Sequence, residues 1–182
     1  GRACRREGGA REALLGSYAK ERGEEPEVVE RLKGADLVGR RYAPIFDYFD
    51  TPERRAEGEA PGPNAWTIIS GDFVTTDDGT GLVHIAPAFG EDDMNVCSAV
   101  GIKAVVPVDE AGRFTGEVPD YAGMQVFDSN RHVIADLRDA TGNLAGRPSS
   151  ERPVLVRQAS YVHSYPHCWR CRKPLIYKAV SS

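Results

Sequence analysis

The stretch from Gly71 to Asp93 constrains the fold of this chain more than any other. Asp77-Asp78-Gly79 predicts a tight hairpin turn, because glycine supplies the positive φ that such turns need. The segments on either side read as two strands, and Pro87 ends the second because proline gives a strand ladder no donor. A helix beginning at Glu91 follows. A histidine, a glycine-rich turn and three adjacent carboxylates thus fall within 23 residues, and such a cluster can bind a cationic amine beside a water.

The periodicity of the whole chain predicts an α+β fold, with a strand-rich core and three or four helices packed around it. The expected strands cover residues 66–70, 73–76, 82–85, 105–108 and 154–162. The expected helices cover residues 10–23, 26–34 and 91–100, together with one that Asp128 or Ser129 caps and that ends before Gly142. Residues 36–49 are expected to be extended, and the polar, Pro/Gly-rich residues 51–64 to form a loop.

Composition places the chain among ordinary globular proteins, with 41% hydrophobic and 27% charged residues. At 182 residues it suits one domain with an appendage. No apolar run approaches the roughly 18 residues that a membrane-spanning helix needs, and the start has no signal peptide. It also lacks an initiator Met, so we expect a piece of a longer protein. The cysteines form no disulfide framework, which favours a reducing, cytoplasmic setting.

The net charge of −4 argues against a basic coat for nucleic acid, although local contacts stay open. The C-terminal stretch is locally basic, through Arg152, Arg157, Arg170, Arg172, Lys173 and Lys178. The charge alone favours a solvated face over a nucleic-acid contact.

Two interpretations apply to the acidic run Glu91-Asp92-Asp93. Acidic side chains in a first helical turn complement the helix dipole, which is worth roughly 0.3–1 kcal/mol. One carboxylate suffices for that, so another could pair with an ammonium group or orient a water. His84 shares a strand face with Leu82 by alternation. It is either a half-exposed polar side chain or a donor or acceptor beside an ester carbonyl.

Two weaker patterns remain. Gly79-Thr80-Gly81 resembles a phosphate cradle only loosely, and the turn interpretation is favoured, although a bare turn also lets a ligand approach the backbone. Cys168 and Cys171, with His163 and His167 nearby, provide half of the four ligands that a structural zinc takes. The second Cys-x-x-Cys knuckle is absent, so we expect zinc in a longer parent protein. A further hypothesis, which rests on Cys168 and Cys171 alone, is that the chain is a small zinc-ribbon protein.

Two long motifs resemble a known family. The first is Gly79-Thr80-Gly81-Leu82-Val83-His84-Ile85-Ala86-Pro87, followed by Gly90-Glu91-Asp92-Asp93. It resembles the editing domain of class I aminoacyl-tRNA synthetases for branched aliphatic amino acids. The second runs from His163 to Cys171, as His-Ser-Tyr-Pro-His-Cys-Trp-Arg-Cys, and continues with Pro174-Leu175-Ile176-Tyr177. It is similar to the isoleucyl-tRNA synthetases in particular, and the resemblance covers residues 10–182.

The resemblance implies a β-barrel-rich editing domain with peripheral helices over residues 1–160, its first strands missing at the N-terminus. Residues 161–182 would be a connection returning toward the zinc knuckle and the synthetic core. The implied activity is hydrolysis, by a positioned water, of valine wrongly esterified to isoleucine tRNA. No cofactor is required for this step. The implied partners are the valine-bearing 3′ end of that tRNA and the rest of the synthetase, with no membrane and a monomeric, cytoplasmic protein.

The resemblance also implies roles for individual residues. Asp93, the second aspartate of the run, corresponds to the family residue that binds the α-amino group, and His84 to the pocket histidine near the side chain or ester. Both are therefore the expected catalytic residues. Thr80, Gly81, Asp92 and Tyr165 are expected among the substrate-binding residues, and Cys168 and Cys171 as half of a metal site.

The chain departs from the family in what it lacks. The threonine-rich strand that holds the terminal adenosine should precede residue 1, as should the first zinc knuckle. The nucleotide-binding signatures of the synthetic site are also missing, so this chain is not expected to activate an amino acid. The alternative function is a tRNA-binding or structural fragment without turnover in isolation.

Overall fold

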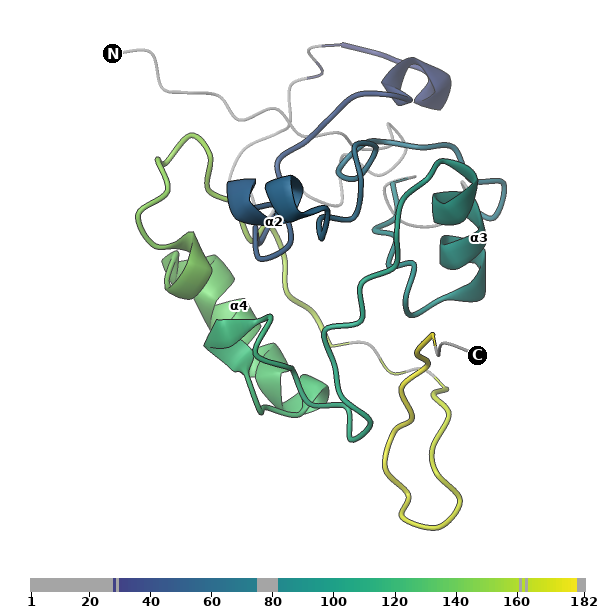
Figure 1. Cartoon of the computed structure of the whole chain (residues 1–182), viewed down its shortest axis with the longest axis vertical. Helices are drawn as coiled ribbons and strands as arrows, with labels where there is room; N and C mark the ends of the chain where they lie inside the picture. Colours follow the sequence, from purple (N-terminus) through teal and green to yellow (C-terminus); the bar gives the residue numbers. More distant parts are fainter. Residues whose placement is uncertain (1–27, 29, 75–81, 161, 163, 180–182) are drawn as a thin grey trace.

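The computed structural model describes residues 28, 30–74, 82–160, 162 and 164–179. These residues form short helices joined by long loops (Figure 1). The α-helices are α2 (Pro52–Glu57), α3 (Glu91–Ala99) and α4 (Val126–Asp139). Three 3₁₀ turns accompany them, namely η2 (Gly34–Leu37), η3 (Pro119–Tyr121) and η4 (Gly142–Leu144).

The prediction of a β-barrel-rich α+β fold is wrong for the described part of the chain. That part contains no strand, and its pairing is limited to isolated antiparallel bridges, Arg41 with Thr67, Val108 with Phe114, Arg113 with Gln125 and His167 with Pro174. Residues 66–70, 73–74, 82–85, 105–108 and 154–160 were expected as strands and are loops or turns. Alternation indicates a half-buried segment, but a strand also needs a ladder partner along its length.

The pairing of residues 39–42 with residues 66–68 illustrates the failure. Three backbone hydrogen bonds of 2.8–2.9 Å join these segments, but they produce only the single bridge between Arg41 and Thr67. Trp66 has a φ of 60°, outside the extended region, so the backbone turns there instead of continuing a ladder. The turn of the predicted hairpin and the end of its first strand, residues 75–81, lie outside the described residues.

Two predicted helices are confirmed. Helix α3 begins at Glu91, and Gly101, with a φ of 75°, follows its end as expected for a stop signal. Cys97 is the buried residue of this helix. Helix α4 begins at Val126, earlier than predicted, because the side chain of Gln125 accepts the N–H of Phe127 at 2.7 Å and caps the helix.

Other helix predictions differ from the structure. Helix α2 lies in the predicted loop 51–64; the Thr51 hydroxyl accepts the N–H of Arg54, Pro52 occupies the first turn, and Gly58 ends the helix with a φ of 73°. The predicted helix 10–23 lies outside the described residues. Of the predicted helix 26–34, residues 30–33 are not helical, and within the expected extended stretch 36–49 the first two residues belong to η2.

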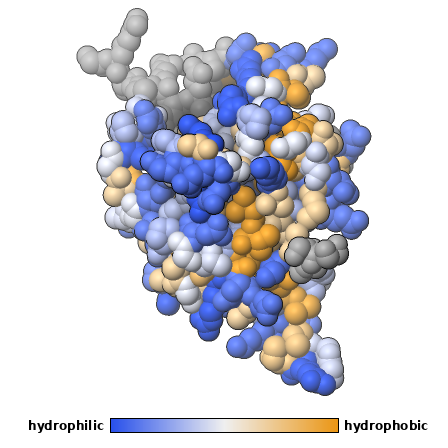
Figure 2. Space-filling view, viewed as in Figure 1, coloured by the Kyte–Doolittle hydropathy of each residue, from blue (hydrophilic) through white to orange (hydrophobic). Residues whose placement is uncertain are grey.

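The buried core is small. Its apolar members are Ala65, Ala88, Cys97, Val108, Val118, Tyr121 and Leu144. Large apolar side chains are exposed elsewhere, and Figure 2 shows apolar surface running as a band down the middle of one face. None of the helices in the described ranges has the length and apolar content that crossing a bilayer requires.

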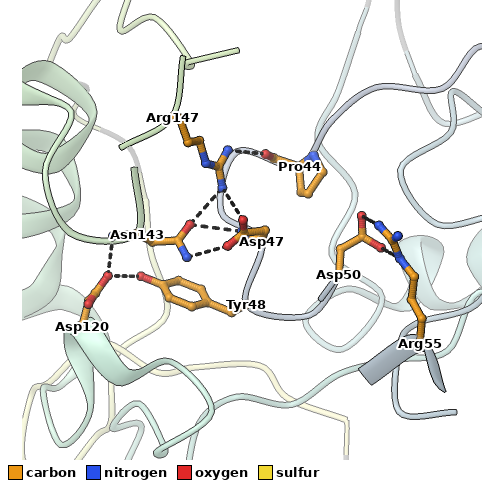
Figure 3. Close-up of polar contacts among 8 residues, drawn as sticks. All are labelled: Pro44, Asp47, Tyr48, Asp50, Arg55, Asp120, Asn143 and Arg147. Carbon is orange, nitrogen blue, oxygen red and sulfur yellow. Dashed lines mark hydrogen bonds and ion pairs between the residues drawn. The ribbon is translucent and has the colours of Figure 1, made fainter. Parts of the chain in front are cut away.

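A polar cluster joins the loop 44–48 to the region around η3 and η4 (Figure 3). Asn143 donates from its side-chain amide to the Asp47 carboxylate at 2.5 Å and accepts the Asp47 N–H at 3.2 Å. Arg147 forms an ion pair with Asp47 at 3.2 Å and donates to the carbonyl of Pro44. The Tyr48 hydroxyl donates to the Asp120 carboxylate at 2.7 Å. These contacts span about 100 residues of sequence and fix the loop that precedes α2.

Candidate functional site

A cavity of about 990 Å³ is lined by residues of two loop segments, 65–71 and 82–89. Its remaining wall comes from the region of η2, from Tyr42 and from the residues that follow α3. The lining is mostly aliphatic and aromatic, as in Trp66, Ile68 and Leu82, and His84 adds an imidazole. This size and character are typical of sites that hold a small organic ligand.

His84 lines this cavity, as the sequence analysis anticipated for a pocket histidine. The expected alternation does not hold, however. Leu82 and His84 line the cavity, but Val83 and Ile85 line it too, because residues 82–86 are an irregular loop and not a strand with two faces. Consecutive residues of this loop therefore all face the cavity, and the loop does not present one face to the cavity and the other to a core.

The segment from Ala86 to Asp93 connects the cavity wall to α3. Phe89 donates its N–H to the carbonyl of Ala86 at 2.8 Å, which closes a turn between the wall and the helix. Asp93, in the first turn of α3, accepts the N–H of Ala86 through Oδ2 at 2.9 Å. A Cβ on Gly90 would lie 3.1 Å from the carboxylate of Asp93, so the glycine leaves room for that side chain. The Gly-Glu-Asp-Asp motif therefore has a local structural purpose: it holds the end of the cavity wall.

Asp93 is half-buried and lies directly beside the cavity, although it is not one of the lining residues. Ala86, to which it is bonded, and Cys97, one helical turn further along α3, both line the cavity. Burial raises the pKa of the Cys97 thiol, and the Asp93 carboxylate raises it further. Among the described residues, no hydrogen bond to the second carboxylate oxygen of Asp93 is formed. That oxygen keeps its capacity to accept from a cation.

Two of the predicted substrate-binding residues, Asp92 and Tyr165, are described by the structure and do not line the cavity. Asp92 is exposed on α3 and does not line it. Tyr165 lies in the C-terminal segment, where its hydroxyl donates to the carbonyl of Leu175 at 2.8 Å and its ring meets Phe127 edge-on at 6.1 Å. Thr80 and Gly81 lie outside the described residues. Among the predicted site residues that the structure describes, His84 and Asp93 belong to one continuous segment, residues 82–93, at the cavity.

Cys168 and Cys171 lie at the tip of a hairpin formed by residues 164–178, which we call the C-terminal hairpin. The N–H of Cys168 donates to the carbonyl of Lys173 at 2.8 Å, and the N–H of Arg172 to the carbonyl of Cys168 at 2.9 Å. The backbone N–H groups of Cys171 and Arg170 also donate to the Cys168 sulfur, which holds the pKa of that thiol below its usual value. A turn that stabilises thiolate in this way suits a metal ligand.

Among the described residues, Cys168 and Cys171 stand alone as candidate metal ligands at this turn. In the described ranges, no three His, Cys, Asp or Glu side chains are grouped so that they could hold a metal ion. His167, the nearest imidazole in sequence, has its Nδ1 2.7 Å from the carbonyl of Tyr165. A structural zinc takes four ligands, so these two thiols could provide at most half of such a set.

Trp66 is a site residue that sequence analysis missed as such. It was expected to be the first residue of a strand, yet its φ of 60° is rare for a bulky aromatic residue. Its ring lines the cavity, and its buried indole N–H has no hydrogen-bond partner among the described residues. Nothing in the residue pattern around Asn64-Ala65-Trp66 could have signalled this conformation.

Comparison with known proteins supplies a family. No family model matches the chain. The curated relatives include the isoleucine–tRNA ligase of Bifidobacterium longum, 54% identical over 169 residues, which are 93% of this chain. Those of Mycobacterium tuberculosis and Corynebacterium diphtheriae are 53% and 50% identical over 171 residues, or 94% of the chain. The chain spans only about 15% of the length of these relatives.

Identity of this extent over nearly the whole chain defines its class as the aminoacyl-tRNA synthetases. Within that class, the chain belongs to the isoleucine–tRNA ligase family, as a fragment that corresponds to one segment of such an enzyme. The resemblance to the isoleucyl-tRNA synthetases is therefore confirmed.

Proposed function

We propose that this segment forms part of the editing site of an isoleucyl-tRNA synthetase, which hydrolyses valine wrongly esterified to isoleucine tRNA in the cytoplasm. The observation that carries the proposal is the loop 82–93: it lines the cavity with His84 and binds the carboxylate of Asp93 through the Ala86 N–H. One short segment thereby holds a histidine and a carboxylate beside an apolar cavity. Hydrolysis of a valyl ester can use both groups, the carboxylate for the α-ammonium group and the imidazole for the water or the ester.

The chemistry assigns a separate role to each side chain. The second carboxylate oxygen of Asp93 accepts the protonated α-amino group of the misattached residue and fixes its orientation. His84 lies beside the ester, where an imidazole can hold the attacking water or the ester oxygen by a hydrogen bond. The water is the nucleophile, the ribose hydroxyl is the leaving group, and no covalent intermediate forms on the protein. Positioning of this kind lowers the barrier because the reacting groups no longer have to find each other.

A hydrolytic cavity answers a physical limit on the synthetic site. In an apolar pocket, one methylene contributes only about 1–3 kcal/mol to the preference for the larger substrate. This general range comes from the discrimination of isoleucine from valine by this class of enzyme, and not from the structure. A second cavity that admits valine and excludes isoleucine by steric clash adds a steeper filter. The residues that set its width would include the aliphatic lining, for example Leu82 and Ile68.

Asp93 also has a local structural role, so the test must separate charge from hydrogen bonding. In the full-length synthetase, Asp93→Asn keeps an oxygen that can accept the Ala86 N–H but removes the charge. We expect it to slow deacylation of valyl-tRNA on the order of 100-fold, because a charge-assisted contact with the substrate ammonium is lost. Asp93→Ala should abolish deacylation, and both variants should keep aminoacylation with isoleucine.

Glu91→Gln is the matched control, since it removes a neighbouring exposed carboxylate from the same helical turn. It should deacylate at the wild-type rate. Normal editing by Asp93→Asn together with loss of editing by Asp93→Ala would show that Asp93 only supports the loop, and the assigned role in binding the ammonium would be wrong.

The Cys168–Cys171 turn is proposed as half of a zinc site completed by ligands from elsewhere in the synthetase. The preorganised Cys168 sulfur supports this proposal. A zinc there would link residues 161–182 to the body of the enzyme, in keeping with a connection, while residues 1–160 belong to the editing part. Zinc takes no part in the hydrolysis.

A second candidate function is a tRNA-binding fragment without turnover when isolated. This second function is favoured by the small number of polar groups in the cavity lining, from which both Asp92 and Tyr165 are absent. Mixing excess fragment with valyl-tRNA would distinguish the two: binding without release of valine supports the second candidate, and release supports the first.

A further inference from the structure

The C-terminal hairpin projects away from the body of the molecule (Figure 1). Its two arms are joined by the N–H of Leu175, which donates to the carbonyl of Pro166 at 3.0 Å, and by the bridge between His167 and Pro174. Its base contacts the body where Ile176 packs close to Gly112. Most of its length is therefore available to a partner.

The charge of this region has one sign. Residues 152–182 carry six of the 23 Lys and Arg residues of the chain and none of its 27 Asp and Glu residues, although the whole chain has a net charge of −4. At the hairpin tip, Arg170, Arg172 and Lys173 are exposed. Within the described part of the chain, no carboxylate forms an ion pair with any of these three. A uniformly positive projection on an acidic protein attracts a polyanion.

Exposed aromatic rings lie among these cations. Trp169 is 79% exposed and Tyr177 65% exposed. The guanidinium carbon of Arg170 lies over the Trp169 ring, 4.7 Å from its centre, so a cation and an aromatic ring are paired at the tip. Aromatic rings on which bases stack, combined with cations that meet phosphates, are the means by which proteins bind single-stranded nucleic acid. A protein partner would fit such a surface only if it were strongly acidic.

The hairpin is also connected to the cavity. Ala179, at the end of the arm that returns from the tip, donates its N–H to the carbonyl of Ala88 at 2.7 Å. Ala88 lines the cavity and belongs to the loop that carries His84. The hairpin thus rises from the rim of the cavity, and a strand whose end occupies the cavity can run along it.

We propose that the C-terminal hairpin is a docking surface for the single-stranded 3′ end of the RNA whose terminal residue enters the cavity. Trp169 stacks on an unpaired base, and Arg172 and Lys173 contact the adjoining phosphates. The choice of RNA as partner rests on the function proposed above. The hairpin adds a grip on the strand outside the cavity, which the loop 82–93 does not provide.

The test measures the affinity of the full-length synthetase for uncharged isoleucine tRNA over a range of salt concentrations. Arg172→Gln/Lys173→Gln should weaken binding about tenfold and lower the slope of log K against log salt by about one to two, because two phosphate contacts are lost. Trp169→Leu should weaken binding about tenfold without changing the slope, because stacking is not ionic. The control Arg40→Gln/Arg138→Gln removes two exposed cations outside the hairpin and should change neither quantity.

A tRNA trimmed of its single-stranded 3′ end provides the second arm. The hairpin variants should bind this trimmed RNA as the wild type does. Wild-type affinity and slope for the intact tRNA in both hairpin variants would overturn the inference. Lower thermal stability of the synthetase with unchanged tRNA affinity would overturn it as well and would identify the hairpin as a contact with another part of the enzyme.

Failure of the inference can be told from failure of the proposed function. Wild-type tRNA affinity in the hairpin variants, together with lost deacylation in Asp93→Asn, would overturn the role of the hairpin and support the editing site. Weakened tRNA binding by the hairpin variants, together with normal deacylation in Asp93→Asn, would support the role of the hairpin and overturn the role of Asp93.

Discussion

Asp93 combines two demands in one side chain. One carboxylate oxygen accepts the Ala86 N–H at 2.9 Å and holds the end of the cavity wall, while the other is available to a ligand. Its position in the first turn of α3 adds the favourable field of the helix N-terminus to the anionic form. A residue with both roles can orient a substrate amine without being oriented by it, which is the preorganisation that catalysis by positioning needs.

The cysteines differ in the environment of their sulfur atoms, and their reactivity should differ accordingly. Burial and the neighbouring Asp93 raise the pKa of Cys97, which is 3% exposed, whereas backbone donors lower the pKa of Cys168. With zinc removed by a chelator, we expect iodoacetamide at pH 7.5 to modify Cys168 well before Cys97, because the thiolate is the reactive species. Mass spectrometry of peptides over time measures the order. Faster labelling of Cys97 would contradict these assignments.

The sequence could predict that His84 and Asp93 lie at the candidate site, but it could not predict Trp66 there or how the residues are arranged. His84 and Asp93 lie on one short segment, so their proximity followed from chain connectivity. The contact between Asp93 and Ala86 depends on the turn at residues 86–89, and the conformation of Trp66 depends on tertiary packing. Neither leaves a signature in residue periodicity. Tyr165 was assigned by resemblance alone, and its place on the hairpin could not be read from the pattern.

Helix α4 shows how an element is ended by side chains. Ala140 takes a left-handed conformation with a φ of 54°, and the Thr141 N–H returns to the carbonyl of Asp136 at 3.3 Å. The Asp136 carboxylate accepts the Thr141 hydroxyl and, at 2.7 Å, the Tyr121 hydroxyl. These donors, with Thr141 first, lower the pKa of Asp136, and the nearby His132 adds to the effect. The last turn of α4 is therefore tied to η3 through an ionised carboxylate.

Acid should weaken this tie. Because the folded pKa of Asp136 lies below its unfolded value of about 3.9, its contribution to stability is present above that value and is lost as the pH falls below it toward the folded pKa. We expect Asp136→Asn to be less stable than the wild type at pH 7 and to lose less stability between pH 5 and pH 3. Urea unfolding at both pH values tests this. An equal loss in the two proteins would show that Asp136 does not titrate as inferred.

The elements themselves divide by the kind of signal that specifies them. Helices α3 and α4 could be predicted because their apolar spacing and flanking residues are local. Helix α2 carries an equally local signal, Thr51 as cap and Pro52 in the first turn, which the Pro/Gly content around it obscured. The strands could not be predicted correctly, because pairing depends on a partner segment. Alternation around Trp66 indicated burial but could not supply that partner.

At the scale of the whole molecule, a small core is supplemented by polar contacts between distant segments. The cluster around Asn143 joins the loop before α2 to η3 and η4 (Figure 3). Asn143 donates from its backbone to Asp120 at 2.7 Å and from its side chain to Asp47. These contacts join a segment that precedes the cavity loop in the sequence to segments that follow it.

Removing the Asn143 amide should therefore lower the stability of the whole fold and not only that of one segment. We expect Asn143→Ala to lower the free energy of unfolding by about 1–3 kcal/mol, because two side-chain hydrogen bonds with Asp47 and one with Arg147 are lost. Chemical denaturation provides the measurement. Asn130→Ala, at an exposed position on α4, is the matched control and should cost less. Equal costs would mean that the cluster is not a principal connection.

The proposed editing reaction depends on the charge of Asp93, which binds the α-ammonium group of a misattached valine. It is tested by the single-turnover hydrolysis rate of valyl-tRNA and of the same tRNA esterified with the 2-hydroxy analogue of valine, by full-length wild type and Asp93→Asn. We predict that the wild type hydrolyses the amino ester much faster than the hydroxy ester and that Asp93→Asn loses this preference. An unchanged preference in Asp93→Asn would show that Asp93 does not bind the ammonium group.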